Sequence, residues 1–247
     1  MSESNAPVAL IVGAGDFIGA EIGKRFAREG YTVCLGRRKG DQLAPLVRAI
    51  EAEGGRAHAF TLDARSEDSV QAVFADIEAR IGPLEVVIFN VGANVRFPLR
   101  ETTARVYRKV WEMACFAGFL VGREAASVMV PRGRGSIFFT GATASLRGGS
   151  GYAAFASAKF GLRALAQSMA RELGPQNIHV AHLVIDSAVD TAWVRERMET
   201  GGVDVQALPE DALMNPASVA QTYWQLHRQP RDAWTFELDI RPYVETW

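Results

Sequence analysis

The stretch VALIVGAGDFIGAEIGKRFAREG, residues 8–30, decides the fold class of this chain. It starts as an uninterrupted apolar run, passes through Gly13, Gly15 and Gly19, and continues with a helical period up to Gly30. An apolar run of this length suggests a strand buried on both faces. Glycines at a strand-to-helix turn let the backbone approach a pyrophosphate, whose charge is favoured by the helix N-terminus. The stretch therefore predicts the first turn of a dinucleotide-binding unit.

The spacing of these glycines is GxGxxxG, which differs from the strict GxGxxG fingerprint. The strict pattern requires glycine at the position of Ile18. The place of the glycines, after the first strand of an alternating series, favours the nucleotide-binding interpretation. The alternative is a turn that needs small residues for packing alone.

Short apolar or β-branched runs alternate with longer stretches of helical period along the whole chain. Strands are predicted at 8–13, 31–36, 56–62, 85–92, 135–141, 178–185 and 234–240, and helices at 17–29, 41–53, 66–81, 102–130, 152–173 and 216–228. Such alternation implies right-handed crossovers between parallel strands. The sequence thus predicts an α/β protein with a doubly wound parallel sheet (Rossmann fold), helices on both faces, and a single domain over residues 1–247.

Residues suited to helix ends mark several of these boundaries. Gly30, Gly54 and Gly82 suit C-terminal caps, Ser66 suits an N-cap, and Asn215 with Pro216 suits an N-cap and first helical position. The least regular segment, residues 186–215, has no clear long period. It is interpreted either as a substrate loop or as a plain surface excursion.

Composition narrows the partners and the compartment. The 27 basic and 28 acidic residues nearly cancel, and no long one-sign run occurs, so a small molecule is expected as partner rather than a nucleic acid or a membrane. Two cysteines, Cys34 and Cys115, suit reduced thiols and a cytoplasmic protein. No basic stretch precedes the first apolar run and no apolar run reaches membrane-spanning length, so neither export nor a membrane span is expected. No metal site is predicted.

The second strand ends in LGRRKG, residues 35–40, where a nucleotide-binding fold meets the adenosine ribose. Arg37 and Arg38 offer cations for the 2′-phosphate of NADP, whereas NAD is usually met by an acidic residue. NADP is therefore the predicted cofactor, with NAD less favoured. Asp16 in the glycine turn would repel the same phosphate, and paired arginines also occur on solvated strand ends.

Five segments in order resemble the short-chain dehydrogenase/reductase family. They are the glycine turn at 13–19, LDA at 62–64, FNVGA at 89–93, AKFGLRALAQSMARELG at 158–174 and VDT at 189–191. The resemblance covers nearly the whole chain. It implies that Gly13 and Gly19 line the pyrophosphate, that Asp63 and Ala64 face the adenine, that Asn90 and Gly92 brace the cofactor-side loop, and that Thr191 approaches the nicotinamide carboxamide. It also implies a homodimer or homotetramer.

The chain departs from the family pattern at the glycine turn and at the catalytic group. In the family's TGxxxGxG motif the threonine corresponds to Val12 and the middle glycine to Phe17. Of the usual Asn, Ser, Tyr and Lys, the first three positions fall on Cys115, Ala142 and Phe155. Only Lys159 matches, and phenylalanine has no proton to exchange.

Candidates for the missing proton chemistry lie near these positions, each with a structural alternative. Tyr152 precedes Lys159 by seven residues, about 10 Å along a helix axis, which suits a pocket wall better than a direct replacement. Thr143 and Ser145 could orient a carbonyl or cap a turn. Asp186 ends the sixth strand, where ligands bind in open α/β sheets.

Two further candidates carry ionisable nitrogens. His182 lies within an apolar strand, where a lone histidine is more often structural than a proton shuttle. Lys159 is expected chiefly to hold the nicotinamide ribose, although a desolvated lysine can also act as an acid.

The resemblance implies an atypical NAD(P)-dependent oxidoreductase that transfers a hydride between nicotinamide and a small carbonyl, alcohol or related C=X group. Two alternatives stay open. One is a non-catalytic NADP(H)-binding sensor or assembly protein with a degenerate active site, and the other is a lyase or isomerase that uses the same pocket.

Overall fold

Seven strands form one fully parallel sheet in the computed structural model, which describes residues 6–246. The strands are β1 (Val8–Val12), β2 (Thr32–Arg37), β3 (Arg56–Thr61), β4 (Leu84–Phe89), β5 (Gly135–Thr140), β6 (Ile178–Ile185) and β7 (Glu237–Ile240), in the order β3-β2-β1-β4-β5-β6-β7. From β1 the chain adds β2 and β3 on one side of the sheet, and then crosses over to add β4 to β7 on the other side, so the strand order reverses between β1 and β4. The predicted doubly wound parallel sheet is confirmed, and its crevice is expected outside the carboxyl ends of these strands.

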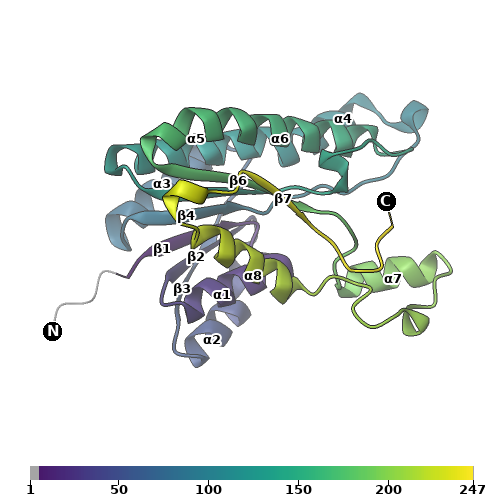
Figure 1. Ribbon diagram of the computed structural model, residues 1–247, viewed down its shortest axis with the longest axis horizontal. Helices are drawn as coiled ribbons and strands as arrows, with labels where there is room; N and C mark the ends of the chain where they lie inside the picture. Colours follow the sequence, from purple (N-terminus) through teal and green to yellow (C-terminus); the bar gives the residue numbers. More distant parts are fainter. Residues whose placement is uncertain (1–5, 247) are drawn as a thin grey trace.

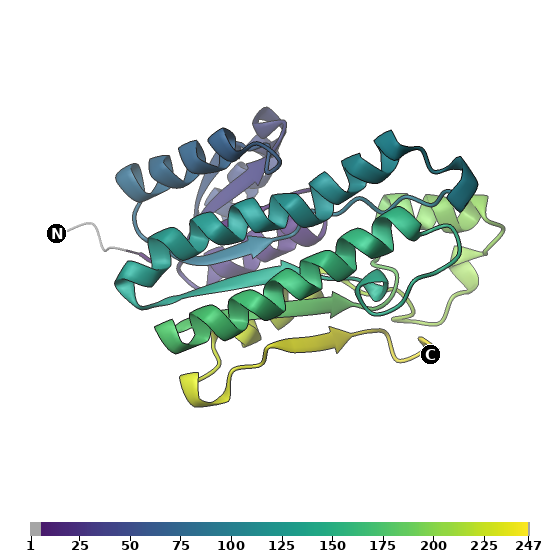
Figure 2. The same ribbon diagram turned by 90° about the horizontal axis from the view of Figure 1, so that it is seen from above.

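Helices cover both faces of the sheet (Figure 1). They are α1 (Ile18–Arg28), α2 (Ala44–Ala52), α3 (Glu67–Arg80), α4 (Ala104–Trp111), α5 (Ala117–Met129), α6 (Ala153–Leu173), α7 (Ala192–Thr200) and α8 (Pro216–His227). Figures 1 and 2 show α3, α5 and α6 on one face, α1, α2 and α8 on the other, and α7 beyond the carboxyl ends of the strands. The helices thus leave that end of the sheet to the connecting loops.

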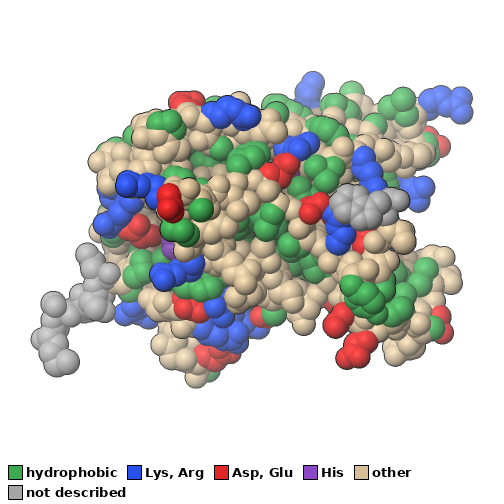
Figure 3. Space-filling model, viewed as in Figure 1, with side chains coloured by type: hydrophobic (Ala, Val, Ile, Leu, Met, Phe, Trp, Pro, Cys, Tyr) green, Lys and Arg blue, Asp and Glu red, His purple; other side chains and the backbone are tan. Residues whose placement is uncertain are grey.

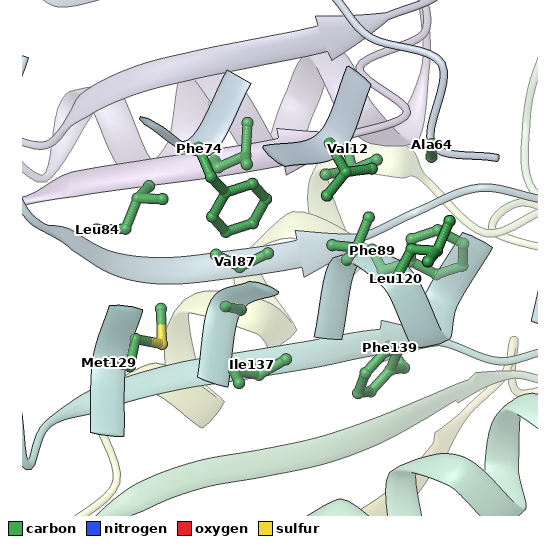
Figure 4. Packing of buried hydrophobic residues seen from close by; sticks show 14 of the residues in the cluster. Val12, Ala64, Phe74, Leu84, Val87, Phe89, Leu120, Met129, Ile137 and Phe139 are labelled. Carbon is green, nitrogen blue, oxygen red and sulfur yellow. The ribbon is translucent and has the colours of Figure 1, made fainter. Parts of the chain in front are cut away.

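Two apolar clusters, one on each face, hold the layers together. The first joins β4 and β5 to α3 and α5 through side chains such as Phe74, Val87, Leu120, Met129 and Ile137 (Figure 4). The second joins the opposite face to α1 and α8. Inner strands such as β1 and β6 are buried on both faces, which is why their sequences are continuous apolar runs rather than alternating ones, whereas the edge strands β3 and β7 are partly exposed.

The predicted helix at 102–130 is divided by a π-helical segment, Glu112–Phe116, between α4 and α5. By length and composition alone, the stretch Ala104–Arg132 would suffice to cross a membrane. Its residues Ala117, Val121 and Ala125 are fully buried against the sheet. The α5 part of the stretch is therefore built into the core of this fold, whereas Val110 is the one buried residue of α4, whose residues are all described.

Most predicted helix ends are confirmed by local geometry. The side chains of Ser66 and Asn215 accept hydrogen bonds from the backbone N–H groups of Ser69 and Ala217. Gly30, Gly54 and Gly82 all have positive φ after a helix. Cys34 and Cys115 are free thiols, as expected.

Two predicted segments are corrected by the structure. Residues 186–215, read as irregular, contain α7, a short 3-10 turn at Val205–Ala207 and an isolated bridge between Val189 and Met214. No residue of α7, whose nine residues are all described, is buried. A helical apolar period appears only where one face of a helix is buried, so the sequence of α7 shows no such period and does not predict the helix. The last strand, Glu237–Ile240, is also shorter than the predicted 234–240, and a 3-10 turn at Arg231–Ala233 precedes it.

Candidate cofactor and active site

A cavity of about 570 Å³ lies at the carboxyl ends of β1 to β4. It lies at the point between β1 and β4 where the strand order reverses, which is where open α/β sheets bind ligands. Its wall is formed by Val12, Gly13, Gly15, Gly36, Arg37, Arg38, Lys39, Gln42, Leu62, Asp63, Ala64, Arg65, Asn90, Val91, Gly92, Met113 and Ala117. The cavity therefore joins the glycine turn to the ends of three other strands.

The glycine turn is shaped by close backbone contacts. Gly13 has φ +90, and a Cβ there would lie 2.5 Å from the carbonyl oxygen of Asn90. A Cβ at Gly19 would lie 2.4 Å from the carbonyl oxygen of Gly13, so α1 packs directly on the turn. Gly15 faces open space at the cavity wall. The three glycines thus bring bare backbone to the start of a helix, as phosphate binding requires.

Three predicted residues of the turn do not line the cavity. Phe17 is the residue before α1 and is partly exposed, at 38%. Ile18 begins the helix and packs on the cluster under α1, and Gly19 is buried beneath the turn. Gly19 shapes the site through its packing, whereas the predicted cofactor contacts of Phe17 and Ile18 lie outside the cavity wall.

The end of β2 brings three cations to the cavity wall: Arg37, Arg38 and Lys39. Arg37 is paired with Asp16, with 3.1 Å between Nη1 and Oδ1. Among residues 6–246, no carboxylate forms an ion pair with Arg38. Arg37 thus neutralises the Asp16 charge that was expected to repel a phosphate, and Arg38 stays available to bind an anion.

Asp63 lies at the cavity wall after β3, as the family pattern implies, but its carboxylate is engaged. It accepts hydrogen bonds from Nε and Nη2 of Arg65, at 2.9 and 2.6 Å, and from the Arg65 backbone N–H. These hydrogen bonds hold the pKa of Asp63 below its ordinary value. Arg65 lines the same wall and neutralises the Asp63 carboxylate, a pairing that the sequence did not predict.

Asn90 connects the glycine turn to the neighbouring strands. Its Nδ2 donates to the carbonyl oxygen of Gly13 at 3.2 Å, and its Oδ1 accepts from the hydroxyl of Thr140 at 3.1 Å. The buried Tyr223 hydroxyl lies 2.6 Å from the Thr140 hydroxyl and, since that hydroxyl's one proton is committed to Asn90, acts as the donor. This chain of hydrogen bonds fixes the floor of the cavity.

Lys159 is buried on α6, only 3% exposed, beside that floor. Its Nζ donates to the carbonyl oxygens of Thr140 at 2.7 Å and Val91 at 3.4 Å. Burial lowers the pKa of Lys159 to about 8. A buried ammonium without a carboxylate partner can exchange its charge near neutral pH, which is the property that proton chemistry needs.

Phe155 lies one helical turn before Lys159, and the Lys159 Nζ is 5.9 Å from the centre of its ring. Phe155 is 6% exposed and belongs to a small apolar cluster with Ala114, Ala144 and Ala158. Ala142 and Cys115 pack against the same cluster. Phe155, Ala142 and Cys115, the positions that the sequence comparison sets against the family's Tyr, Ser and Asn, therefore gather around one apolar patch next to Lys159.

The hydroxyl candidates after β5 are placed differently. Ser145 is fully buried, and its hydroxyl accepts a hydrogen bond from the backbone N–H of Ala142 at 3.1 Å. This contact favours the second alternative for Ser145, capping of the turn. Thr143 starts the same 3-10 turn, Thr143–Ser145, and is half-buried.

The remaining candidates lie beyond the strand ends. Tyr152 precedes the first residue of α6 and is half-buried. Asp186 is 4% exposed, with Oδ2 3.4 Å from Nη2 of Arg241. The Thr191 hydroxyl accepts from the backbone N–H of Val194 and so caps α7. None of the three lines the cavity.

His182 is fully buried and bonded through Nδ1 to Glu237 at 3.0 Å, and Glu237 also binds Arg163. Burial lowers the pKa of His182 to about 4, so the ring is neutral at ordinary pH. This favours the structural interpretation of His182. Within residues 6–246, no group of three or more metal-ligating side chains is found.

The geometry and the comparisons with known proteins agree on the family. The model of the family described as short chain dehydrogenase matches residues 7–201. The chain belongs to the short-chain dehydrogenase family.

Individual relatives share different parts of the chain. A short-chain dehydrogenase from Rhodopseudomonas palustris, known from its crystal structure, is 60% identical with a TM-score of 0.82, covering 97% of this chain and 99% of that one. The 2-dehydro-3-deoxy-D-gluconate 5-dehydrogenase of Formosa agariphila is 30% identical over 174 residues, which are 70% of this chain and 66% of that protein. A metagenomic short-chain oxidoreductase in complex with NADP shares the fold, at 24% identity and a TM-score of 0.82, covering 97% of this chain and 98% of that one.

Proposed function

We propose that this protein is an NADP-preferring oxidoreductase that transfers a hydride between nicotinamide and a small carbonyl, alcohol or related C=X group. The observation that carries the proposal is the cavity at the reversal of the sheet, with the glycine turn at one side and cations at another. The dehydrogenase names of its relatives and the NADP complex of the metagenomic relative support it.

The cavity wall fits the parts of NADP in their expected order. Gly13 and Gly15 present backbone to a pyrophosphate, and Arg38 with Lys39 offers positive charge to a 2′-phosphate. Ala64, after β3, borders the place of the adenine. Asp63 is bonded to Arg65, so it does not oppose the phosphate with an unpaired charge.

Bound NADP would supply the hydride acceptor or donor, and the chain's own residues would orient it. Lys159 is held rigidly by two carbonyl oxygens and is suited to bind the nicotinamide ribose. Asn90 keeps the glycine turn and the β5 end in register. The apolar patch around Phe155 would exclude water from the reacting carbon.

We also propose that this member works without the usual phenol. Phe155 and Ala142 offer no exchangeable proton, whereas Lys159 carries a proton with a pKa of about 8 and lies 5.9 Å from the Phe155 ring. The proton would then come from Lys159 or from water bound beside it. A loss of about 10² to 10⁴ in rate is expected where no group substitutes for a general acid.

The second candidate function is a non-catalytic NADP(H) sensor or assembly protein. The apolar patch at the three altered positions favours it, because nothing polar replaces the lost side chains there. Under this alternative the protein would bind NADPH and turn over no carbonyl.

A paired titration tests the proposal. NADPH and NADH are titrated against the protein by nucleotide fluorescence, and turnover is then followed on a panel of carbonyls and alcohols through nicotinamide absorbance. Arg38→Ala is expected to weaken NADPH at least tenfold and NADH little, with the exposed Arg48→Ala on α2 as matched control. Binding of neither nucleotide would refute the proposal, and binding without turnover would favour the sensor.

We propose further that the protein is cytoplasmic and forms a homodimer or homotetramer. Exposed aromatic side chains on the α4–α6 face support association, among them Trp111, Phe119 and Phe160, each about two-fifths exposed. Light scattering at several concentrations measures the mass of the assembly.

A further inference from the structure

The loop after β4 and the turn before α6 are joined at Gly151. The backbone N–H of Phe97 donates to the carbonyl oxygen of Gly151 at 2.9 Å. Gly151 has φ +84, and a Cβ there would lie 2.9 Å from Cγ of Arg96. The bare backbone of Gly151 is therefore what lets the Arg96 side chain lie against this turn.

Arg96 and Tyr152 meet on this platform. The guanidinium carbon of Arg96 is 5.8 Å from the centre of the Tyr152 ring, a cation–π arrangement that limits the rotamers of the arginine. Arg96 is exposed, and none of the carboxylates in residues 6–246 forms an ion pair with it. The guanidinium is thus positioned by packing while its hydrogen-bond donors face no fixed anion.

Other arginines near this end of the sheet are already committed to acids. Arg195 binds both oxygens of Asp190, and Arg241 pairs with Asp186 and Asp239. Arg96 differs from them because an aromatic ring orients it and, within residues 6–246, no carboxylate pairs with it.

The place of this pair relative to Lys159 suits a substrate group rather than the cofactor. Tyr152 precedes Lys159 by seven residues, about two turns and 10 Å along the helix axis on the same side. Tyr152 packs on the apolar cluster that contains Phe155, and neither Arg96 nor Tyr152 lines the nucleotide cavity. A molecule with its reacting carbon near Lys159 could therefore extend toward Arg96.

We propose that Arg96, supported by Tyr152 and Gly151, binds a carboxylate of the substrate. The substrate class is then small hydroxy- and oxo-carboxylates. A planar guanidinium binds a carboxylate through two parallel hydrogen bonds, and prior orientation reduces the entropy lost on binding. This inference rests on the proposed oxidoreductase function, since it assigns the substrate of that same site.

The test compares carboxylates with the alcohols that share their carbon skeleton. The probes are D-gluconate with D-glucitol, lactate with 1,2-propanediol, and 3-hydroxybutyrate with 1,3-butanediol, each added to the full-length protein saturated with NADP⁺. Binding is measured by calorimetry and by ligand-observed NMR, so the readout does not depend on turnover. At least one carboxylate is expected to bind about tenfold or more tightly than its alcohol.

Variants of the loop decide whether Arg96 is responsible. Arg96→Ala is expected to abolish the preference for the carboxylate, and Arg96→Lys to retain part of it. Arg100→Ala, an exposed arginine in the same loop region, is the matched control and should keep the preference. Unchanged NADPH affinity and melting temperature in each variant show that the fold is intact, and if Arg96→Ala fails this check, Arg96→Gln takes its place.

The inference is overturned if no carboxylate binds better than its alcohol, or if the preference survives in Arg96→Ala. Failure of the parent protein to bind NADPH would instead reject the proposed function itself. Because nucleotide and carboxylate binding are measured separately, the two failures are distinguishable.

Discussion

Replacing Lys159 by methionine is predicted to change how stability depends on pH. Lys159 is 3% exposed, and burial lowers its pKa from 10.5 to about 8. Between these two pH values the unfolded chain binds a proton at this residue that the folded chain has released. Stability therefore rises with pH across this window in the parent protein, and Lys159→Met removes that rise. The titratable groups facing Lys159 are Cys115 and His182, and the variant keeps both.

The magnitude follows from the two pKa values. Linkage with a folded pKa of about 8 and an unfolded pKa of 10.5 gives a gain of about 2 kcal/mol in the free energy of unfolding between pH 7 and pH 9.5. At pH 7 the variant loses the hydrogen bonds to Thr140 and Val91 but also the cost of burying a charge. These two effects oppose each other, so the pH dependence is the sharper quantity.

Urea unfolding of both proteins at pH 7 and at pH 9.5 gives four free energies. The difference between parent and variant should grow by about 2 kcal/mol in favour of the parent at the higher pH. Groups that titrate in this range away from Lys159 are common to both proteins and cancel, and a Cys115→Ala background removes the thiol whose pKa depends on Lys159. Parallel pH profiles would refute the reasoning and would mean that the lysine keeps an ordinary pKa in the fold.

Three further substitutions probe the site. Asp16→Asn should strengthen NADPH binding up to about fivefold and leave NADH unchanged, because the exposed pair with Arg37 is worth at most about 1 kcal/mol; titration of both nucleotides measures this. Gly19→Ala should lower the free energy of unfolding by about 1 to 3 kcal/mol and weaken both nucleotides, since its Cβ would meet the backbone of Gly13; an unchanged urea midpoint would contradict this contact. Phe155→Tyr should raise turnover by about 10² on a substrate found by the panel, and no gain in kcat would show that this position does not reach the reacting carbonyl.

The sequence predicts those parts of the structure that depend on residues close to one another along the chain. Ser66 and Asn215 cap helices with their own side chains, and Gly13 has the positive φ that its turn needs. The cations of β2 reach the cavity because parallel strands end at one edge. The doubly wound parallel sheet follows from the alternation of strands and helices and from the family resemblance, whereas the strand order comes from the structure.

The parts that the sequence could not predict depend on contacts between distant loops or on elements without burial. Helix α7 buries no residue, so no apolar period marks it. The Asp63–Arg65 pair neutralises the negative charge expected after β3, and spacing alone does not show which way a side chain turns. The Arg96–Tyr152 contact joins loops more than fifty residues apart through a glycine whose role appears only in three dimensions.

The two halves of the cleft are therefore specified in different ways. The nucleotide half is made of backbone and strand ends, and replacing the middle glycine of the motif by Phe17 leaves it intact because Gly13 and Gly19 supply the close approach. The half that we propose to be catalytic is made of side chains, and Cys115, Ala142 and Phe155 form one apolar patch beside Lys159 there. A fold can keep its cofactor cavity while its proton chemistry changes, since backbone packing constrains the first and single side chains decide the second. For this reason Lys159, which belongs to both halves, is the residue whose titration is most informative about the reaction.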